Sequence, residues 1–260
     1  MIRLRDKMNV ASRLRYLFWR LNRSSAPVRV TLKDGITCEL RPQPTTDLVC
    51  AYEVFVSDVY QCPRPELLGN VTRIVDIGAN IGLSCLAWAK RYPEAEIIGF
   101  EPHPTHYSIA EKQMRMNGFQ ERVTLVQAAA GISDGTAVLS DAGVKSSLVQ
   151  SGPQQFQSGP PQDRLEVGVV DMFRFLAGQP TDLLKIDIEG YEYVLLGDDR
   201  FADLRPRTIV LEWHNTTDFP DGGRWSTLRL NALGYNVFEG NDQHQNTGLL
   251  WGFRDDRFQA

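Results

Sequence analysis

The chain has 260 residues, of which 42% are hydrophobic and 23% charged, and this composition is ordinary for one main globular domain. The net charge of −4 argues against a general nucleic-acid-binding protein, so no nucleic-acid partner is expected. No apolar run approaches the roughly 18 residues that a membrane span needs, and the start of the chain lacks the apolar stretch of a secretory signal. We therefore expect a cytoplasmic protein. Its four widely spaced cysteines form no CxxC pair that would predict a zinc site.

The first 23 residues differ from the rest of the chain in charge. They hold seven Arg and Lys residues against one acid, a net +6, which leaves −10 for the remainder (21 basic minus 31 acidic). Within residues 5–22, apolar side chains recur at helical spacing and predict an amphipathic helix, at Val10, Leu14, Leu17, Phe18 and Leu21. Such a helix either packs on the domain with its arginines in solvent, or contacts a membrane surface or a partner.

A β-hairpin and a further helix are predicted next along the chain. Residues 28–32 and 36–40 alternate between apolar and polar side chains around a short turn that contains glycine, which is typical of a hairpin. Residues 45–60 have the spacing of a helix. We therefore divide the chain into an N-terminal extension, 1–44, and a main domain, 45–260.

From Val71 onward, short apolar strands alternate with helices. This order predicts a doubly wound, Rossmann-like α/β sheet that is mostly parallel and ends in a C-terminal antiparallel hairpin. The segment 142–163 is rich in Gly, Ser, Pro and Gln, and we expect a long loop there, either a lid or an inert insertion. The predicted strands are 73–77, 96–101, 123–128, 182–188 and 208–212, followed by 235–239 and 248–254; the predicted helices are 81–91, 105–117, one from 191, and 225–233.

The segment Val75–Gly82 links the first of these strands to its helix and predicts a cofactor loop. Ligands of open α/β sheets lie beyond the carboxyl ends of the strands, where Gly78 permits a tight turn and close approach. A dinucleotide fingerprint requires glycines at the places that Asn80 and Leu83 occupy here. Asp76 would repel a pyrophosphate but suits the ammonium group of a methionine moiety. The loop therefore favours S-adenosylmethionine over a nicotinamide dinucleotide.

Acidic residues follow two further strands. Glu101 lies 23 residues after Gly78, where an acid accepts hydrogen bonds from ribose hydroxyl groups. Lys185, Asp187 and Glu189 lie in an apolar strand, and alternation places them on the same side of it. Buried charges are costly unless they are paired or used, so their place at the carboxyl end of the strand predicts a catalytic role.

Three of these segments together resemble the FkbM family of methyltransferases, and the resemblance covers roughly residues 45–255. It implies a class I methyltransferase fold, S-adenosylmethionine as the methyl donor, and transfer to a hydroxyl oxygen of a small molecule, sugar or secondary metabolite. The segments are Asp76–Gly82, Phe100–Pro102 and Lys185–Glu192, with similar shorter ones at Ser146–Leu148 and Val170–Asp171.

The resemblance also implies which residues contact the cofactor. The loop residues would lie at the methionine end, Glu101 at the ribose and the residues after the third strand near adenine, while Tyr60 would close over the ligand. The set comprises Tyr60, Asp76, Gly78, Ala79, Asn80, Gly82, Glu101, Pro102, Gln127 and Ala128.

Methylation of an alcohol is helped by a base within hydrogen-bond reach. The candidates are Asp187, Glu189 and His214, and Lys185 completes the predicted catalytic set as a partner of either acid. The two acids, with Glu212 and His214, would also suit Mg²⁺, but we favour a site without metal.

Two other functions remain open at this point. One is a nicotinamide-dependent oxidoreductase, which the missing glycines disfavour. The other is a non-catalytic homologue that still binds S-adenosylmethionine. The expected partner is a small-molecule or sugar hydroxyl acceptor, and the basic N-terminal helix offers a further contact to a membrane or a protein.

Overall fold

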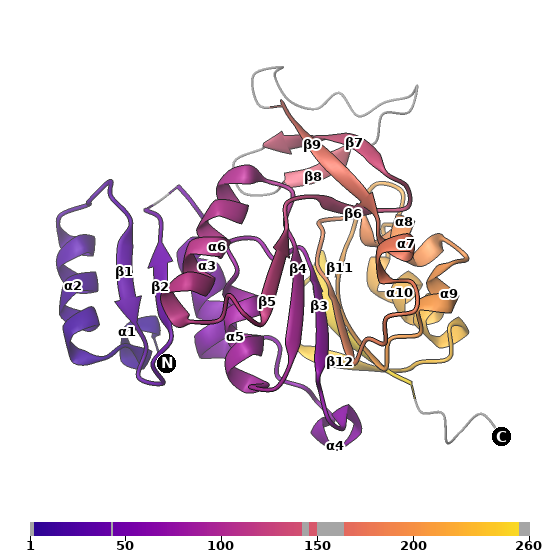
Figure 1. The fold of residues 1–260 in the computed structure, drawn as a ribbon, viewed down its shortest axis with the longest axis horizontal. Helices are drawn as coiled ribbons and strands as arrows, with labels where there is room; N and C mark the ends of the chain where they lie inside the picture. Colours follow the sequence, from indigo (N-terminus) through magenta and orange to yellow (C-terminus); the bar gives the residue numbers. More distant parts are fainter. Residues whose placement is uncertain (1–2, 43, 142–145, 150–163, 255–260) are drawn as a thin grey trace.

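The computed structural model describes residues 3–42, 44–141, 146–149 and 164–254 (Figure 1). It is a three-layer α/β structure in which helices cover both faces of a central sheet. Among the residues described, no helix is both long and apolar enough to cross a membrane.

Seven of the described strands form the central sheet in the order β12-β13-β11-β10-β3-β4-β5. The five strands from β11 to β5 are parallel, while β13 is antiparallel to both β11 and β12. The order reverses between β3 and β10, which is where an open α/β sheet forms a ligand crevice. The strands are β3 Arg73–Ile77, β4 Glu96–Phe100, β5 Val123–Val126, β10 Leu183–Ile186, β11 Thr208–His214, β12 Asn236–Gln243 and β13 Thr247–Phe253. The predicted parallel sheet with a C-terminal hairpin is confirmed.

Helices on the two faces bury two separate hydrophobic clusters. Successive residues of β3 alternate between them, with Ile74 in one cluster and Val75 in the other, as the pleat requires. The first face carries α3 Asp47–Tyr52, α5 Leu83–Arg91 and α6 Pro104–Asn117 (Figure 1). The second carries α7 Met172–Leu176, α8 Glu192–Gly197, α9 Phe201–Leu204 and α10 Gly222–Ala232.

The N-terminal region adds a helix and a hairpin beside α6. The hairpin is β1 Val28–Thr31 and β2 Thr37–Leu40, as predicted. It docks on α6 through hydrogen bonds such as that from the Thr37 N–H to Asn117 Oδ1, 2.8 Å. Its apolar side chains belong to the same cluster as those of α5. The division at residue 44 stays a prediction.

The single helix predicted over 5–22 is wrong, because the structure has α1 Leu4–Lys7 and α2 Val10–Leu21. Asn9 separates them, since its side chain accepts a hydrogen bond from the Ser12 N–H at 2.9 Å and so caps α2. The helix packs on β1, but its predicted apolar face points to solvent.

A four-stranded sheet, β6-β9-β7-β8, lies beside the central one and corrects the prediction of a loop over 142–163. Ser146–Val149 forms β8, which pairs with β7 in antiparallel register. The small and polar residues around it hid this strand from pattern analysis, and 142–145 and 150–163 lie outside the described residues. The other strands are β6 Ala129–Gly131, β7 Gly135–Asp141 and β9 Arg164–Asp171.

Several element ends differ from the predictions. The predicted helix over 45–60 is α3 followed by a π-helical turn, η1 Glu53–Ser57, and a short helix, α4 Pro65–Leu68, comes before β3. Strand β10 ends at Ile186, so Asp187 and Glu189 lie in the turn after it, and Glu189 has a positive φ of 53°. The prediction that strand alternation places Lys185, Asp187 and Glu189 on the same side is therefore wrong beyond Ile186, where the strand ends.

Candidate active site

A cavity of about 320 Å³ lies at the carboxyl ends of the central strands. Its walls come from the loop after β3, the ends of β4, β10 and β11, the start of β6, and helix α3. Leu139 of β7 and Thr247 of β13 complete it, so both the second sheet and the C-terminal hairpin contribute. This is the size and position of a ligand site in a doubly wound sheet.

Gly78 brings the loop after β3 against the turn after β10. Its φ is 87°, and a Cβ atom added there would lie 1.9 Å from the carbonyl oxygen of Asp187. The glycine is therefore required by contact with the protein's own backbone, in addition to any ligand. Lys185 Nζ donates a hydrogen bond to the Gly78 carbonyl at 3.0 Å and holds the same junction from below.

Lys185 is the centre of a buried charge group. It is 1% exposed, and its Nζ lies 3.0 Å from Asp76 Oδ1 and 3.4 Å from Asp187 Oδ2. Burial alone lowers the pKa of Lys185, but the charges of Asp76, Tyr60 and Asp187 outweigh it and raise that pKa well above its usual range. Lys185 therefore stays protonated and acts as a bridging cation, not as a base.

Asp76 lies behind this lysine. Its carboxylate is fully buried and also accepts a hydrogen bond from the Ser84 hydroxyl group. It does not line either cavity, and in the structure it supports Lys185, so its direct contact with a ligand stays a prediction.

Glu101 follows β4 and is held by the backbone on two sides. Its Oε2 accepts from the Asn80 N–H and its Oε1 from the His103 N–H, both at 2.8 Å. It is 6% exposed, and it lines the cavity together with Pro102. The predicted ribose-binding acid thus lies where a ligand along the loop would meet it.

The other predicted cofactor contacts fall into two groups. Tyr60, Ala79 and Asn80 line a smaller cavity of about 90 Å³ that shares Gly78 and Asp187 with the larger one. The second group does not line either cavity: Gly82 packs on α6, Gln127 is exposed and Ala128 is buried. Ala129 and Ala130 provide the wall in place of Gln127 and Ala128. As ligand contacts, all of these residues stay predictions.

His214, at the end of β11, is surrounded by carboxylates. Its Nδ1 lies 3.2 Å from Glu192 Oε1, and its Nε2 lies 3.4 Å from Glu189 Oε2 and 3.6 Å from Glu212 Oε1. Burial lowers the pKa of His214, but the hydrogen bond and charge of Glu192, with the charges of Asp187 and Glu189, raise it to about 9. The imidazole is therefore a cation at neutral pH.

Glu212 lines both cavities and faces this cation. Burial and then the charge of Asp187 raise its pKa to about 8, although His214 and Lys185 lower it. The Thr247 hydroxyl group donates to Glu212 Oε1 at 3.1 Å. The result is a carboxylate whose ionisation occurs close to physiological pH.

Asp187, Glu212 and His214 offer one ligand atom each, and these atoms all lie within 4.8 Å of one another. The separation suits a divalent cation, and carboxylates are ligands that Mg²⁺ accepts. His214 fits less well, because both of its ring nitrogens face carboxylates, which is the environment of a protonated imidazole.

Two residues of this site were missed or given a different role by sequence analysis. Glu192 was not among the candidate site residues, but it is fully buried and orients His214, also accepting from the His214 N–H at 2.9 Å. Glu212 was considered only as a metal ligand. Period-two alternation in β11 places Glu212 and His214 on one side, which is the signal that could have linked them.

A family model for the FkbM methyltransferase domain matches residues 76–237, more than half of the chain. The chain belongs to the FkbM methyltransferase family. The match begins at Asp76 and includes Glu101 and the contact between Gly78 and Asp187. It also includes His214 and the carboxylates that surround it. This confirms the family resemblance of the sequence, and the strand order of the central sheet is that of a class I methyltransferase. The oxidoreductase and the non-catalytic homologue are not supported.

Two curated relatives of this FkbM methyltransferase are themselves named methyltransferases. It is 28% identical over 191 residues to methyltransferase sdnD of Sordaria araneosa, and the alignment covers 62% of this chain and 73% of that protein. It is 29% identical over 213 residues to methyltransferase 1 of Beauveria bassiana, covering 74% of this chain and 84% of that one.

Solved structures with a similar fold are more distant. The methyltransferase FkbM from Methylobacillus flagellatus KT is 16% identical with a TM-score of 0.49, and the alignment covers 80% of this chain but 52% of that one. An O-methyltransferase family protein from Burkholderia thailandensis is 13% identical with a TM-score of 0.48, covering 81% and 58%. The chain thus spans just over half the length of these two proteins.

Proposed function

We propose that this FkbM methyltransferase methylates a hydroxyl oxygen of a small molecule, with S-adenosylmethionine as the methyl donor. The observation that carries the proposal is a single cavity lined by Glu101 after β4 and, on the other side of β3, by Asp187 and Glu189 of the turn after β10 and by Glu212 of β11. Such a site matches a ligand with a ribose at one end and positive charge at the other.

Glu101 supports the ribose end of this proposal. Each of its oxygens already accepts one backbone N–H, and an ionised carboxylate has about four acceptor positions. Two therefore remain for hydroxyl groups of a ribose. Because Asn80 and His103 fix the carboxylate, little side-chain freedom is lost on binding.

The charges at the other end support a cationic ligand. When bound, S-adenosylmethionine supplies a methyl group that its sulfonium already activates. Asp187 lines both cavities and Glu189 lines the larger one, and in a partly buried site their carboxylates attract a sulfonium and an ammonium group. The same carboxylates would repel the pyrophosphate of a dinucleotide.

We assign the proton acceptor to Glu212. It lines the cavity, and once it has lost its own proton, a carboxylate with its pKa raised to about 8 is a stronger base than an ordinary one. His214, the candidate from the sequence, is cationic and does not line the cavity, so it holds Glu189 and Glu212 in position. Asp187 and Glu189 complete the acidic wall against which an acceptor hydroxyl group aligns.

The proposed reaction needs no metal. Lys185 pairs with Asp187 and His214 faces Glu212, so the carboxyl groups that a divalent cation would bind already have cationic partners. Turnover is accordingly expected to be the same with EDTA as with added Mg²⁺. Loss of turnover in EDTA that Mg²⁺ restores would assign Asp187, Glu212 and His214 as ligands instead.

The activity is tested by methyl transfer from isotope-labelled S-adenosylmethionine to a panel of small hydroxyl compounds and sugars, with products identified by mass spectrometry. Label on oxygen supports the proposal. Label on nitrogen or carbon alone would reject the proposal of a hydroxyl acceptor but would still support S-adenosylmethionine as the methyl donor.

The roles of the carboxylates are tested by substitution. We expect Glu212→Gln, Asp187→Ala and Glu189→Ala each to reduce kcat by roughly 100-fold or more, the range for loss of a general base. Binding of S-adenosylmethionine, measured by isothermal titration, should weaken less than turnover in each variant. Glu239→Gln, which changes an exposed side chain of β12, is the matched control and should retain activity. Turnover at the wild-type rate in Glu212→Gln would contradict the assignment of the base.

A further inference from the structure

The outward face of α2 exposes large apolar side chains to solvent. It carries four of the seven exposed large hydrophobic residues in the described part of the chain: Val10 (77% exposed), Leu14 (64%), Phe18 (70%) and Leu21 (82%). Isolated exposed apolar residues are common, but a group on one face of one helix marks an interaction surface. We call these four residues the outer stripe of α2.

The opposite face fixes this orientation. Trp19 is 9% exposed, and its Nε1–H donates to the Ala26 carbonyl at 2.7 Å. The buried Ser12 hydroxyl group accepts from the Thr31 N–H, also at 2.7 Å. Because both anchors lie across the helix from the outer stripe, α2 cannot turn the stripe inward without breaking them.

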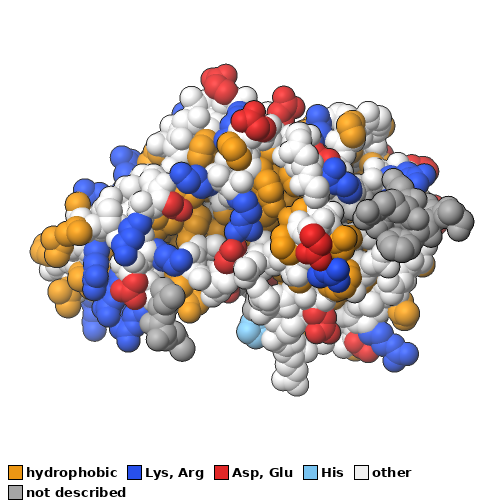
Figure 2. All heavy atoms as spheres, turned by 90° about the horizontal axis from the view of Figure 1, so that it is seen from below, with side chains coloured by type: hydrophobic (Ala, Val, Ile, Leu, Met, Phe, Trp, Pro, Cys, Tyr) orange, Lys and Arg blue, Asp and Glu red, His pale blue; other side chains and the backbone are white. Residues whose placement is uncertain are grey.

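Arginines flank the outer stripe on both edges. At about 100° per residue, Arg13 and Arg20 lie along one edge and Arg15 along the other. The helix itself contains no acid, and residues 1–23 carry a net +6 against −10 for the rest of the chain. Figure 2 shows hydrophobic side chains beside a group of Lys and Arg at this end of the molecule.

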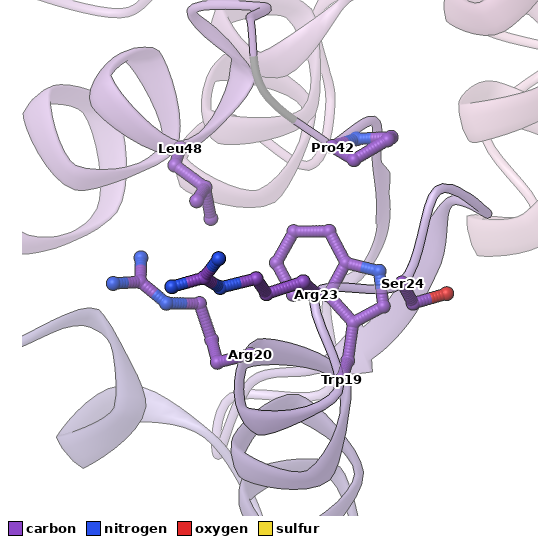
Figure 3. A pocket seen from close by; sticks show the side chains of 6 residues that line it. All are labelled: Trp19, Arg20, Arg23, Ser24, Pro42 and Leu48. Carbon is purple, nitrogen blue, oxygen red and sulfur yellow. The ribbon is translucent and has the colours of Figure 1, made fainter.

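A pocket at the end of α2 adds a place for an anion. It has a volume of about 400 Å³, and Arg20 and Arg23 both extend into it between Trp19 and Leu48 (Figure 3). Among the described side chains, neither guanidinium group has a hydrogen-bonded or ion-pair partner. Two adjacent guanidinium groups suit the oxygens of a phosphate, which they bind through paired N–H donors.

We propose that α2 binds the surface of a bilayer that contains anionic phospholipids. The helix lies in the plane of the interface with the outer stripe among the first acyl carbons, while the arginines on its two edges, Arg13, Arg15 and Arg20, contact lipid phosphates. Apolar residues bordered by arginines on both edges of a helix fit a fluid anionic interface. The negative remainder of the chain is repelled from the same membrane and so directs the basic end toward it.

A second copy of the chain is a poorer occupant of the outer stripe. Symmetric pairing of two α2 helices would bring two segments of +6 together. An acidic protein remains as the other source of negative charge, and the test below separates it from lipid.

Vesicle co-sedimentation of the full chain tests the proposal. We expect binding to vesicles of an equal mixture of phosphatidylglycerol and phosphatidylcholine, with affinity at least roughly ten-fold lower on pure phosphatidylcholine and at high salt. The double variant Leu14→Ser/Phe18→Ser, and separately Arg13→Gln/Arg20→Gln, should each lose binding by roughly ten-fold or more. Leu228→Ser on α10, where the leucine is 60% exposed, is the matched control and should bind as wild type.

Three outcomes would overturn the proposal. The first is folded wild-type protein that does not bind the anionic vesicles. The second is binding that the Leu14→Ser/Phe18→Ser variant retains. The third is a dimer in sedimentation velocity that this variant dissociates, because the outer stripe would then be a protein interface. Vesicle binding does not depend on turnover, so a chain that binds vesicles but fails the methyl-transfer assay contradicts only the proposed function.

Discussion

The active site buries charged residues, whereas helix α2 exposes apolar residues to water, and both arrangements run against the usual preference of these side chains for solvent or core. In the active site, Lys185 is 1% exposed and Glu192 is fully buried, yet each has charged partners within the chain. On α2, Phe18 is 70% exposed, and apolar side chains in water have no compensating partner. The active site is therefore complete in itself, whereas the outer stripe of α2 gains only from something outside the chain.

The largest effect of a single substitution is expected where a buried pair is broken. Lys185→Met should lower the free energy of unfolding by about 3–5 kcal/mol, because Asp76 is left buried without its cation. Urea denaturation followed by circular dichroism measures the change. This result would sharpen the comparison by showing that the active-site charges depend on one another.

Two further variants control this prediction. Asp76→Asn combined with Lys185→Met removes both charges and should be more stable than Lys185→Met alone. Lys112→Met, which removes an exposed partner of Glu39, should cost about 1 kcal/mol or less. If Lys185→Met lowers the free energy of unfolding no more than Lys112→Met does, the buried charges of the active site do not depend on one another.

A comparable effect is expected from pH. The pKa of His214 is raised from 6.5 to about 9 and that of Glu212 from 4.5 to about 8, so the folded chain binds both protons more tightly than the unfolded chain. Their contribution to stability is complete below the unfolded pKa values and is lost as pH rises through the folded ones. The free energy of unfolding should therefore fall by roughly 5 kcal/mol between about pH 6.5 and 9.

Urea denaturation across this pH range measures the slope. Glu212→Gln removes one of the two titrating groups, so its slope should be shallower than that of the wild type. A wild-type stability that rises toward pH 9 would show that the site does not hold these protons.

The smallest effect is expected on α2. Phe18→Ser or Leu14→Ser should change the free energy of unfolding by no more than about 0.5 kcal/mol, because both side chains are already in water. Thermal and urea denaturation without vesicles measure it, and Trp19→Ala, which removes the buried anchor, serves as the destabilised reference. A loss above about 2 kcal/mol for Phe18→Ser would place the outer stripe in a core and remove the contrast with the active site.

Much of the fold could be predicted because its elements have strong local signals. Strand β3 and the hairpin of β1 and β2 match the predicted residues closely, since apolar alternation and glycine turns specify them. The break before α2 was missed because Asn9 interrupts an otherwise continuous helical pattern, and capping depends on one side chain. Strand β8 was missed because its stability comes from pairing with β7, which lies outside any local window.

The candidate site was predicted in position more than in role. Asp187, Glu189 and Glu101 were expected at strand ends, and the structure places them around one cavity. The direction in which each side chain points depends on tertiary contacts that the sequence pattern does not contain. Asp76 is therefore turned toward Lys185, and His214 becomes a cation through Glu192, a residue from another helix.

The junction of Gly78 with the Asp187 backbone has a consequence for catalysis. Because the two segments touch and Lys185 contacts both, the loop after β3 and the acidic turn after β10 are held together before any ligand arrives. A ligand then meets charges already oriented and does not have to order them, so its binding energy is not consumed in rearranging the site. The same fixed contact limits how far this side of the cavity can adapt to its ligand. Acceptor molecules of different size must therefore be accommodated by α3, β7 and the C-terminal hairpin on the other side of the cavity.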